Sequence, residues 1–195
     1  AKIRAIYEDH NQNLWIGCYH RGMVMVSKES TPFHFWSVPT REYPQAGVIT
    51  ALYKDDDGHI VSGVEGEGVF KITSEGNITD HLFSGKTVSS IYKDYSGNLW
   101  FGGYYSGLYM QDAKGNVRFM LPEIKLKDIK KITGDDKGNL YLSLFGSGFI
   151  RYHLPTQTVT EYQSSSGGLR NNWIYTLLLD SRERLWIGHC NGVDY

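Results

Sequence analysis

The feature that most constrains this chain is an internal repeat with a period of roughly 43 residues. At one column of the repeat, Trp15 is followed by Val61, Trp100, Tyr141 and Trp186, which gives steps of 46, 39, 41 and 45 residues. Periods of this length are typical of β-propeller blades or of helical arrays. The aligned segments are IRAIYEDHNQNLWIGCYHRGM from Ile3, ITALYKDDDGHIVSGVEGEGV from Ile49, VSSIYKDYSGNLWFGGYYSGL from Val88, IKKITGDDKGNLYLSLFGSGF from Ile129 and IYTLLLDSRERLWIGHCNGV from Ile174.

The content of each unit favours strands over helices. Segments such as NLWIG and NLWFG are short, aromatic and β-branched, and each follows a turn cluster rich in Asp, Gly and Asn. The pairs Ile129/Ile132 and Ile174/Leu177 have an i, i+3 spacing that a helix would also show. The runs around them are only about seven residues long, which is marginal for a helix. A Gly then introduces a third run, such as GFIRY, and a turn introduces a fourth, such as TVTEY, so each unit predicts four strands.

The expected fold class is therefore all-β, with about four and a half propeller blades of four antiparallel strands. We place the blades at about 1–46, 47–86, 87–127 and 128–172, with a partial blade at 173–195, in one continuous domain. Propellers close with typically four to eight blades, and an open array leaves a strand edge and an apolar face at each end. We expect a fragment of a larger propeller, and self-association through the open edges would cover these faces.

Composition and charge exclude several classes. With 20 Lys and Arg against 21 Asp and Glu the net charge is −1, which argues against a nucleic-acid partner or a polybasic membrane contact. The residues AVILMFWYC make up 41% of the chain, enough to bury a core. No run approaches the roughly 18 apolar residues of a membrane span. The two cysteines, Cys18 and Cys190, would meet only if the first and fifth blades were neighbours.

An Asp recurs at the end of the first strand in all five units. We expect it to accept backbone N–H bonds within the following turn. The DDDG run resembles a calcium loop, but Gly66 stands where the loop needs its last Glu, so a structural turn is favoured and no metal is expected. The Trp column is expected to pack one blade on the next, with sugar stacking as the alternative. The recurring Asp residues are Asp9, Asp55, Asp94, Asp135 and Asp180.

The links between the second and third strands are the best candidates for a contact surface, because the repeat does not dictate their residues. In a propeller they emerge on one face near the central channel. They carry aromatic and hydrogen-bonding side chains suited to sugars or peptides, although each taken singly fits a solvated loop as well. The candidates are Tyr19, His20, Arg21, Glu65, Glu67, Tyr104, Tyr105, Phe145, His189 and Asn191.

The sequence offers little for catalysis. The seven His residues are dispersed, without HExxH spacing, and no GxSxG, P-loop or dinucleotide-binding GxGxxG is present in a strand-to-helix context. Glu65 and Glu67 could form a glycosidase pair, but two carboxylates two positions apart in a loop are more often solvated. No catalytic residue and no cofactor is expected.

With the repeats established, the motif D-x-x-G-N-L-W-[IF]-G followed by G-[LV], and the segment LRNNWIYTLLLD, resemble the two-component regulator propeller repeat. The match is strongest at DYSGNLWFGGYYSGL and DSRERLWIG, and weaker where Val61 and Ser62 replace the aromatic and apolar pair and where Ser143 replaces Gly. The resemblance implies a periplasmic module of a hybrid two-component receptor, typical of Bacteroidetes, followed in whole receptors by a Y_Y_Y-type domain, a membrane helix and a histidine kinase. Such receptors sense glycan oligosaccharides, often as dimers.

Three functions follow from these observations. The leading hypothesis is a non-catalytic sensor fragment whose glycan ligand shifts a kinase equilibrium. The first alternative is a propeller scaffold for receptor dimerisation without a ligand of its own. The second is a propeller lyase or hydrolase resembling virginiamycin B lyase, which would need an acid/base pair or a metal on the loop face.

Overall fold

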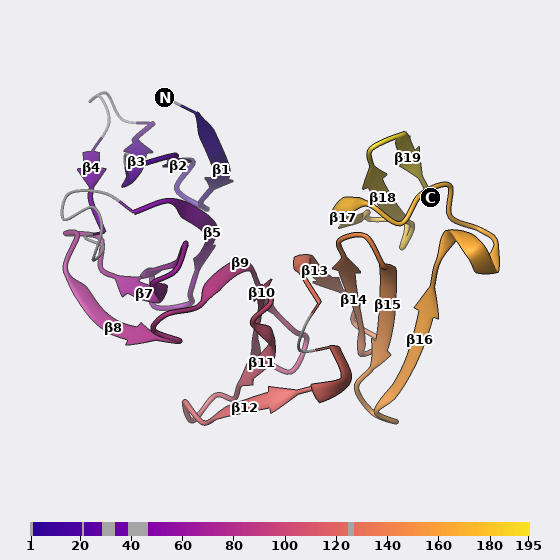
Figure 1. Ribbon diagram of the computed structural model, residues 1–195. Helices are drawn as coiled ribbons and strands as arrows, with labels where there is room; N and C mark the ends of the chain where they lie inside the picture. Colours follow the sequence, from indigo (N-terminus) through magenta and orange to yellow (C-terminus); the bar gives the residue numbers. More distant parts are fainter. Residues whose placement is uncertain (1, 21, 29–33, 39–46, 125–126) are drawn as a thin grey trace. The chain divides into compact units, whose positions relative to one another are not determined.

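The computed structural model describes residues 2–20, 22–28, 34–38, 47–124 and 127–195, and Figure 1 shows its strands. In this part of the chain the strands form five antiparallel sheets, four with four strands and the last with three. Each sheet is a meander in which sequence neighbours pair, so the predicted all-β fold of four-stranded propeller blades is confirmed. The last sheet contains more than half of a blade.

The strands of each sheet follow one another along the chain. The first sheet is β1 (Ile3–Glu8), β2 (Leu14–Cys18), β3 (Gly22–Val26) and β4 (His34–Trp36), and the second is β5 (Ile49–Lys54), β6 (Ile60–Val64), β7 (Gly68–Ile72) and β8 (Ile78–Leu82). The third is β9 (Thr87–Lys93), β10 (Leu99–Tyr104), β11 (Gly107–Gln111) and β12 (Val117–Met120), and the fourth is β13 (Ile129–Gly134), β14 (Asn139–Leu144), β15 (Gly148–His153) and β16 (Thr158–Tyr162). The fifth is β17 (Ile174–Leu179), β18 (Leu185–His189) and β19 (Gly192–Asp194).

The chain divides into two compact units, Ala1–Ser89 and Ser90–Tyr195. The first two sheets form unit 1, and the last two sheets with most of the third form unit 2. The helical elements of the described residues are two short 3-10 turns, η1 (Pro122–Ile124) and η2 (Ser164–Ser166). No helix among these residues has the length and apolarity of a membrane span.

A β-bulge in the first strand explains the i, i+3 spacing of apolar residues. Within β13, Ile129 pairs with Leu144 and Lys131 pairs with Ser143, so the register shifts across the intervening residue. The shift resets the alternation of the strand, and both Ile129 and Ile132 are buried. The same shift occurs in β1, β5 and β17. The spacing that a helix would also produce is therefore the mark of a bulged strand.

Glycines in the second strand allow close packing between neighbouring sheets of one unit. A Cβ atom on Gly17 would lie 2.9 Å from Cγ2 of Ile49, and one on Gly102 would lie 2.6 Å from Cγ2 of Ile129. The fourth sheet has Ser143 in this column instead. Its hydroxyl is fully buried and accepts a hydrogen bond of 2.9 Å from the amide of Lys131 in the bulged strand. The hydroxyl of Ser143 is thus hydrogen-bonded within its own sheet, and the pairing of the strands is maintained.

Trp15, Val61 and Trp100 of the Trp column are buried, as expected, whereas Tyr141 and Trp186 are partly buried, and the aromatic members of the column connect the turn to the core. Trp15 and Trp100 are 4% and 2% exposed, and each indole N–H donates to the Asp six residues earlier, at 3.0 Å to Asp9 and 2.8 Å to Asp94. The other oxygen of each carboxylate accepts two backbone N–H groups of the turn. The predicted capping role of the Asp column is confirmed, and the bond to Trp extends it.

Blades without Trp anchor the same carboxylate with another donor. The hydroxyl of Tyr141 lies 3.2 Å from Oδ2 of Asp135, and the ammonium of Lys71 lies 2.7 Å from Oδ2 of Asp55. Lys71 pairs with Val61 across β6 and β7, so its side chain reaches the place that an indole would fill. Burial raises the pKa of Tyr141 to about 12, with a further contribution from the charge of Asp135.

Candidate functional site

The predicted contact residues within the described part of the chain lie at the end of the second strand or in the turn that leads to the third. Tyr19 and His20 lie between β2 and β3, and Glu65 and Glu67 between β6 and β7, all in unit 1. Arg21 falls outside the described residues. The remaining five belong to unit 2 and divide among three turns: Tyr104 and Tyr105, Phe145, and His189 with Asn191.

The two turns of unit 1 are separate small clusters. The Tyr19 and His20 rings meet edge to face at 4.0 Å, and the guanidinium of Arg4 lies 4.9 Å from the centre of the Tyr19 ring. In the other turn the side chain of Glu65 is exposed, and the carbonyl of Glu67 lies 2.6 Å from Nε2 of His81.

The turns of unit 2 build a larger group of exposed rings, which we call the aromatic cluster: Tyr104, Tyr105, Phe145, Trp173 and Tyr175. Tyr104 and Tyr105 meet edge to face at 4.4 Å, and Phe145 meets Trp173 at 4.7 Å and Tyr175 at 5.1 Å. Four of these residues are 51–58% exposed, and Phe145 is half-buried. Large rings that touch one another and still face solvent are a common basis for ligand recognition.

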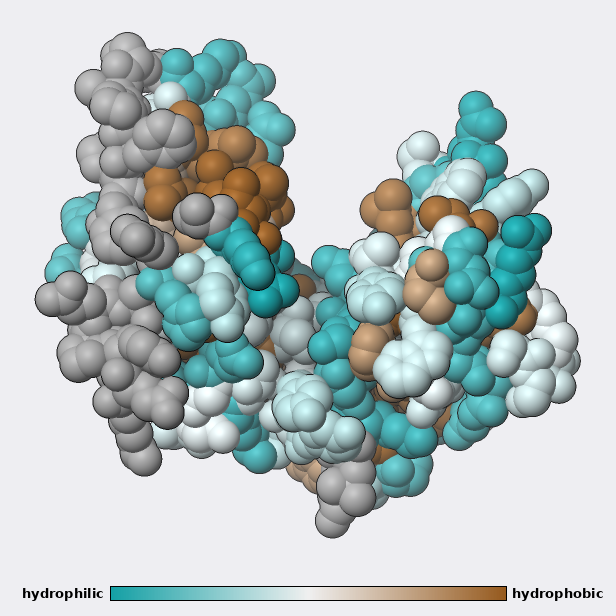
Figure 2. Space-filling view, turned by 45° about the horizontal axis from the view of Figure 1, so that its top comes forward, coloured by the Kyte–Doolittle hydropathy of each residue, from teal (hydrophilic) through white to brown (hydrophobic). Residues whose placement is uncertain are grey.

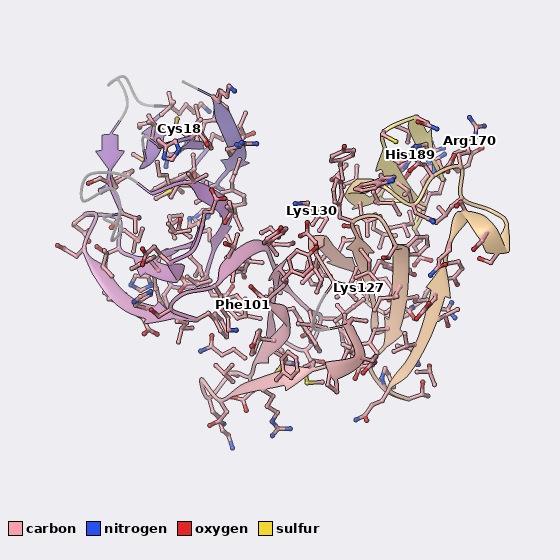
Figure 3. All side chains as sticks on the ribbon, viewed as in Figure 1. Cys18, Phe101, Lys127, Lys130, Arg170 and His189 are labelled. Atoms are coloured by element: carbon pink, nitrogen blue, oxygen red, sulfur yellow. The ribbon has the colours of Figure 1, made fainter. Side chains whose placement is uncertain are left out.

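Lys130 connects the two halves of the aromatic cluster. Its ammonium lies 5.0 Å from the centre of the Phe145 ring and 5.9 Å from that of Tyr104. It also lies 2.8 Å from Oδ2 of Asp128, a carboxylate that is only 7% exposed. Figure 3 labels Lys130 and the neighbouring Lys127, whose ammonium donates to the hydroxyl of Ser147 at 3.0 Å. A cation held by a buried carboxylate is fixed in place over two rings.

The β-bulges position Lys130 and one ring of the aromatic cluster, Tyr175. Lys130 is the residue between Ile129 and Lys131, where the register of β13 shifts, and Tyr175 has the same position in β17. A bulge re-aims a side chain that would otherwise follow the pleat. In unit 1 the bulge of β1 likewise contains Arg4, whose guanidinium lies over Tyr19. Bulge residues and the turn after the second strand therefore form one recurring surface element.

His189 and Asn191 belong to a different group within unit 2. The side chain of His189 is fully buried, with Nδ1 accepting the amide of Asn191 at 3.1 Å and Nε2 lying 3.2 Å from Asp194. The same carboxylate accepts the amide of Arg170 at 3.0 Å, and Figure 3 labels Arg170 and His189 beside the last sheet. This histidine ties the β18–β19 turn to the preceding loop and presents no ring edge to solvent.

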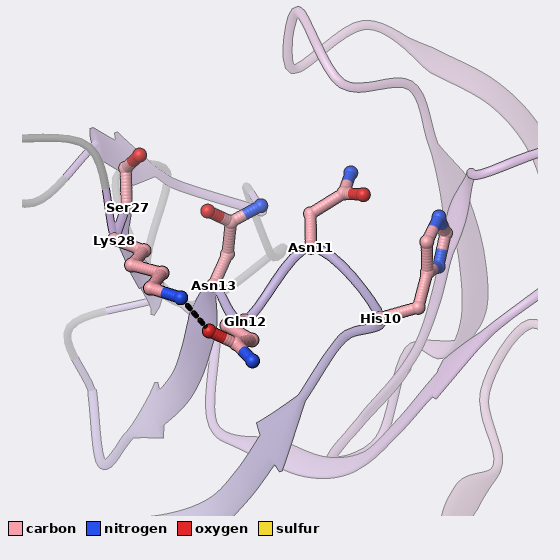
Figure 4. Close-up of a pocket in the computed structure, with 6 residues that line it drawn as sticks. All are labelled: His10, Asn11, Gln12, Asn13, Ser27 and Lys28. Carbon is pink, nitrogen blue, oxygen red and sulfur yellow. Dashed lines mark hydrogen bonds between the residues drawn. The ribbon is translucent and has the colours of Figure 1, made fainter.

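Two other groups of polar residues lie together on the surface. A polar hollow of about 530 Å³ beside the β1–β2 turn is lined by residues including His10 and Asn11, and a hydrogen bond joins Lys28 to Gln12 across it (Figure 4). This hollow is open to solvent, and no buried polar group among the described residues points into it.

In the DDDG turn Asp55, Asp57 and His59 lie within reach of one ion. The ammonium of Lys71 already forms an ion pair with the Asp55 carboxylate, so the structure favours a salt bridge that stabilises the turn over a metal site.

Sequence reasoning identified Tyr104, Tyr105 and Phe145 but did not include Lys130, Trp173 or Tyr175. These three residues lie at the beginning of the first strand or just before it, where the repeat predicts core residues. The available signal was the residue after the first Ile of each repeat, as in IKKI and IYTL, because that position interrupts the alternation. On the hydropathy scale of Figure 2, Trp and Tyr have pale colours, so exposed rings of these two types are not marked as hydrophobic there.

With this geometry described, comparisons with known proteins identify the repeat. Residues 1–20, 82–105 and 168–191 match the family described as Two component regulator propeller. These three segments match two-component regulator propeller repeats. A relative named Histidine kinase P4, from Formosa agariphila, is 28% identical over 170 residues, which cover 75% of this chain. The aligned part is 12% of that protein, so this chain spans a small fraction of its length.

Solved structures with the same fold come from several systems. The extracellular domain of BT4673 from Bacteroides thetaiotaomicron, assigned to the one component systems, has a TM-score of 0.76 at 19% identity, covering 98% of this chain and 27% of its own. That of BT3049, assigned to the hybrid two component systems of the same species, has a TM-score of 0.66 at 19% identity, covering 99% and 33%. Virginiamycin B lyase from Staphylococcus aureus has a TM-score of 0.76 at 15% identity, covering 95% and 62%. At these identities the likeness shows the fold alone.

Proposed function

We propose that this chain is a non-catalytic recognition segment of an extracytoplasmic, periplasmic sensor in a hybrid two-component system, and that it binds oligosaccharides through the aromatic cluster. The observation that carries the proposal is the group of touching, solvent-exposed rings around Lys130. Two comparisons support the proposal: the match of three segments to two-component regulator propeller repeats, and the similarity of the fold to the extracellular domain of a hybrid two-component system.

The chemistry of the cluster suits sugars. The C–H face of a pyranose ring packs on an aromatic face, and its hydroxyl groups need nearby donors and acceptors to replace water. Phe145 and Trp173 offer faces and edges at right angles, with an interplanar angle of 83°. The ammonium of Lys130 adds donors at the centre of the cluster. Ligand binding would act on signalling only by favouring one of two receptor arrangements.

Binding can be measured directly with the 195-residue chain. We expect a panel of oligosaccharides to contain ligands that change the fluorescence of Trp173 and that give a heat of binding by calorimetry. Trp173→Ala and Phe145→Ala should each weaken this binding at least roughly tenfold. Phe119→Ala is the matched control, because Phe119 is an exposed aromatic of unit 2 on the outer strand β12. Unchanged affinity in the two cluster variants would refute the proposal.

The same experiment addresses catalysis. A sensor returns its ligand unchanged, so the bound oligosaccharide should be recovered intact after prolonged incubation with the chain. Release of shorter or unsaturated products would instead favour the lyase or hydrolase alternative, whose fold this chain shares.

A second candidate function is scaffolding for receptor dimerisation. On β1, Ile3 and Ile6 are 55% and 60% exposed, whereas the corresponding Ile129 and Ile132 are buried. We propose that a second copy of the chain covers this face. Light scattering at several concentrations should then show a dimer that Ile3→Ser with Ile6→Ser dissociates. A monomer at all concentrations would contradict this candidate.

A further inference from the structure

The charges beside the aromatic cluster bear on which sugars it takes, and the argument rests on the proposed function. The β10–β11 and β14–β15 turns that supply Tyr104, Tyr105 and Phe145 contain no charged residue between positions 103 and 107 or between 144 and 148. The segment 127–130, which contacts these turns, contains two ammonium groups, Lys127 and Lys130, and one carboxylate, Asp128.

The carboxylate and the ammonium groups differ in access to solvent. Asp128 is 7% exposed, and its Oδ1 is buried without a hydrogen-bond partner, so its charge faces inward. The side chain of Lys130 is 32% exposed, and Lys127 is exposed. The surface that a ligand would meet is therefore cationic, although the local charge including Asp128 is only +1. An ammonium has three N–H donors. Asp128 can accept one of those of Lys130, which leaves the others for a ligand.

One of the two equivalent turns in unit 1, between β6 and β7, has the opposite character. Between β6 and β7 the sequence VEGEG presents Glu65 and Glu67 in place of aromatic rings, with Glu65 exposed. A cationic surface is thus not a general property of these turns in the repeat. In unit 2 the cationic groups lie beside the turns and on the strand bulge that build the aromatic cluster, as the Arg4 guanidinium lies over Tyr19 in unit 1.

We infer that the aromatic cluster selects acidic oligosaccharides, in which a uronate carboxylate or a sulfate ester projects from a sugar that packs on Phe145 and Trp173. Lys130 is the specificity-determining residue, because Asp128 and the two flanking rings fix its ammonium where that anionic group would lie. Lys127 adds a second cation at the rim. Neutral oligosaccharides would bind through the rings alone and more weakly.

The test compares acidic oligosaccharides with their neutral parents. The probes are oligogalacturonate against galacto-oligosaccharide of equal length, and a sulfated against an unsulfated galactan oligosaccharide. We expect at least one acidic probe to bind about tenfold more tightly than its neutral partner at low salt, and this preference should shrink as sodium chloride is added. Equal affinity for acidic and neutral probes would overturn the inference.

Variants separate the cations from the rings. Lys130→Gln combined with Asp128→Asn removes the ammonium without leaving a buried carboxylate unpaired, and it should remove most of the preference for the acidic probe while neutral binding persists. Lys127→Gln, an exposed change that leaves folding intact, should reduce the preference about threefold. Lys114→Gln removes the same charge from the distant β11–β12 turn and is the matched control.

The outcomes distinguish this inference from the proposed function. If the lysine variants retain the preference for acidic probes, the assignment of Lys130 fails, whereas binding that Trp173→Ala abolishes would still support oligosaccharide recognition. If neither class of probe binds at all, both proposals fail together. Binding of the acidic probe by wild-type protein, lost with Lys130 and insensitive to Lys114, supports the inference.

Discussion

Replacing Asp94 by Ala should be among the most destabilising single changes in unit 2, because one carboxylate satisfies four donors. Its oxygens accept the indole N–H of Trp100 at 2.8 Å, the amides of Ser96 and Asn98 at 2.9 Å each, and the side-chain amide of Asn98 at 2.9 Å. Trp100 is 2% exposed, so water cannot replace the lost partner of its indole. A buried donor without a partner costs about 1–3 kcal/mol, and the three turn donors, which water reaches more easily, add roughly 0.5 kcal/mol each.

The expected loss in the free energy of unfolding is thus about 2.5–4.5 kcal/mol, or roughly 5–18 °C in the thermal midpoint of a chain of this size. The same sheet offers a matched control in Asp112, which caps the β11–β12 turn with hydrogen bonds to Lys114 and Asn116 but bonds no Trp and lies open to solvent. Urea titrations followed by tryptophan fluorescence would compare Asp94→Ala with Asp112→Ala. The control should unfold close to the wild type. Equal losses in the two variants would refute the reasoning, because the turn alone would then account for the stability.

Three further predictions concern stability and ionisation. Gly102→Ala should cost about 1–3 kcal/mol in chemical denaturation, since its Cβ would lie 2.6 Å from Ile129, and a neutral result would mean that the sheets separate easily. Burial opposes the charge of Asp9 and Asp135, but hydrogen bonds outweigh it and hold both pKa values below the ordinary value. Their stabilisation is present above a pH of about 3.9 and is lost as pH falls, so the thermal midpoint should drop there, more steeply than in Asp9→Asn. In an ultraviolet titration of the folded chain, Tyr141 should ionise near its pKa of about 12, and Tyr141→Phe should remove that late step.

The sequence was sufficient to predict the fold, because the repeat imposes the four-strand frame on four blades and its first three strands on the fifth, and each turn after the first strand begins with Asp. It was less informative about the surface. Tyr104, Tyr105 and Phe145 could be found because they interrupt the repeat in a loop position. Lys130 and Tyr175 could not, since they lie in the first strand and only the bulge turns them toward the loop face.

Side-chain contacts that depend on the folded structure could not be predicted from the sequence either. The inward position of His189 is set by Asp194, a residue of the next strand, and nothing in the turn sequence distinguishes a buried ring there from an exposed one. The indole bond to Asp could have been anticipated, because a constant separation of six residues links the two columns.

The exchange of donors at the turn carboxylate has a consequence for how such repeats are counted. An indole, a phenol and an ammonium each contact the Asp at this position of the repeat, so the turn needs a donor there but not one particular residue type. The segments that match the family belong to the blades that retain Trp, whereas those with Val61 and Tyr141 in that column fold alike and escape the match. Blade numbers taken from sequence matches are for that reason lower bounds, and distant members of this repeat are best sought through the turn carboxylate.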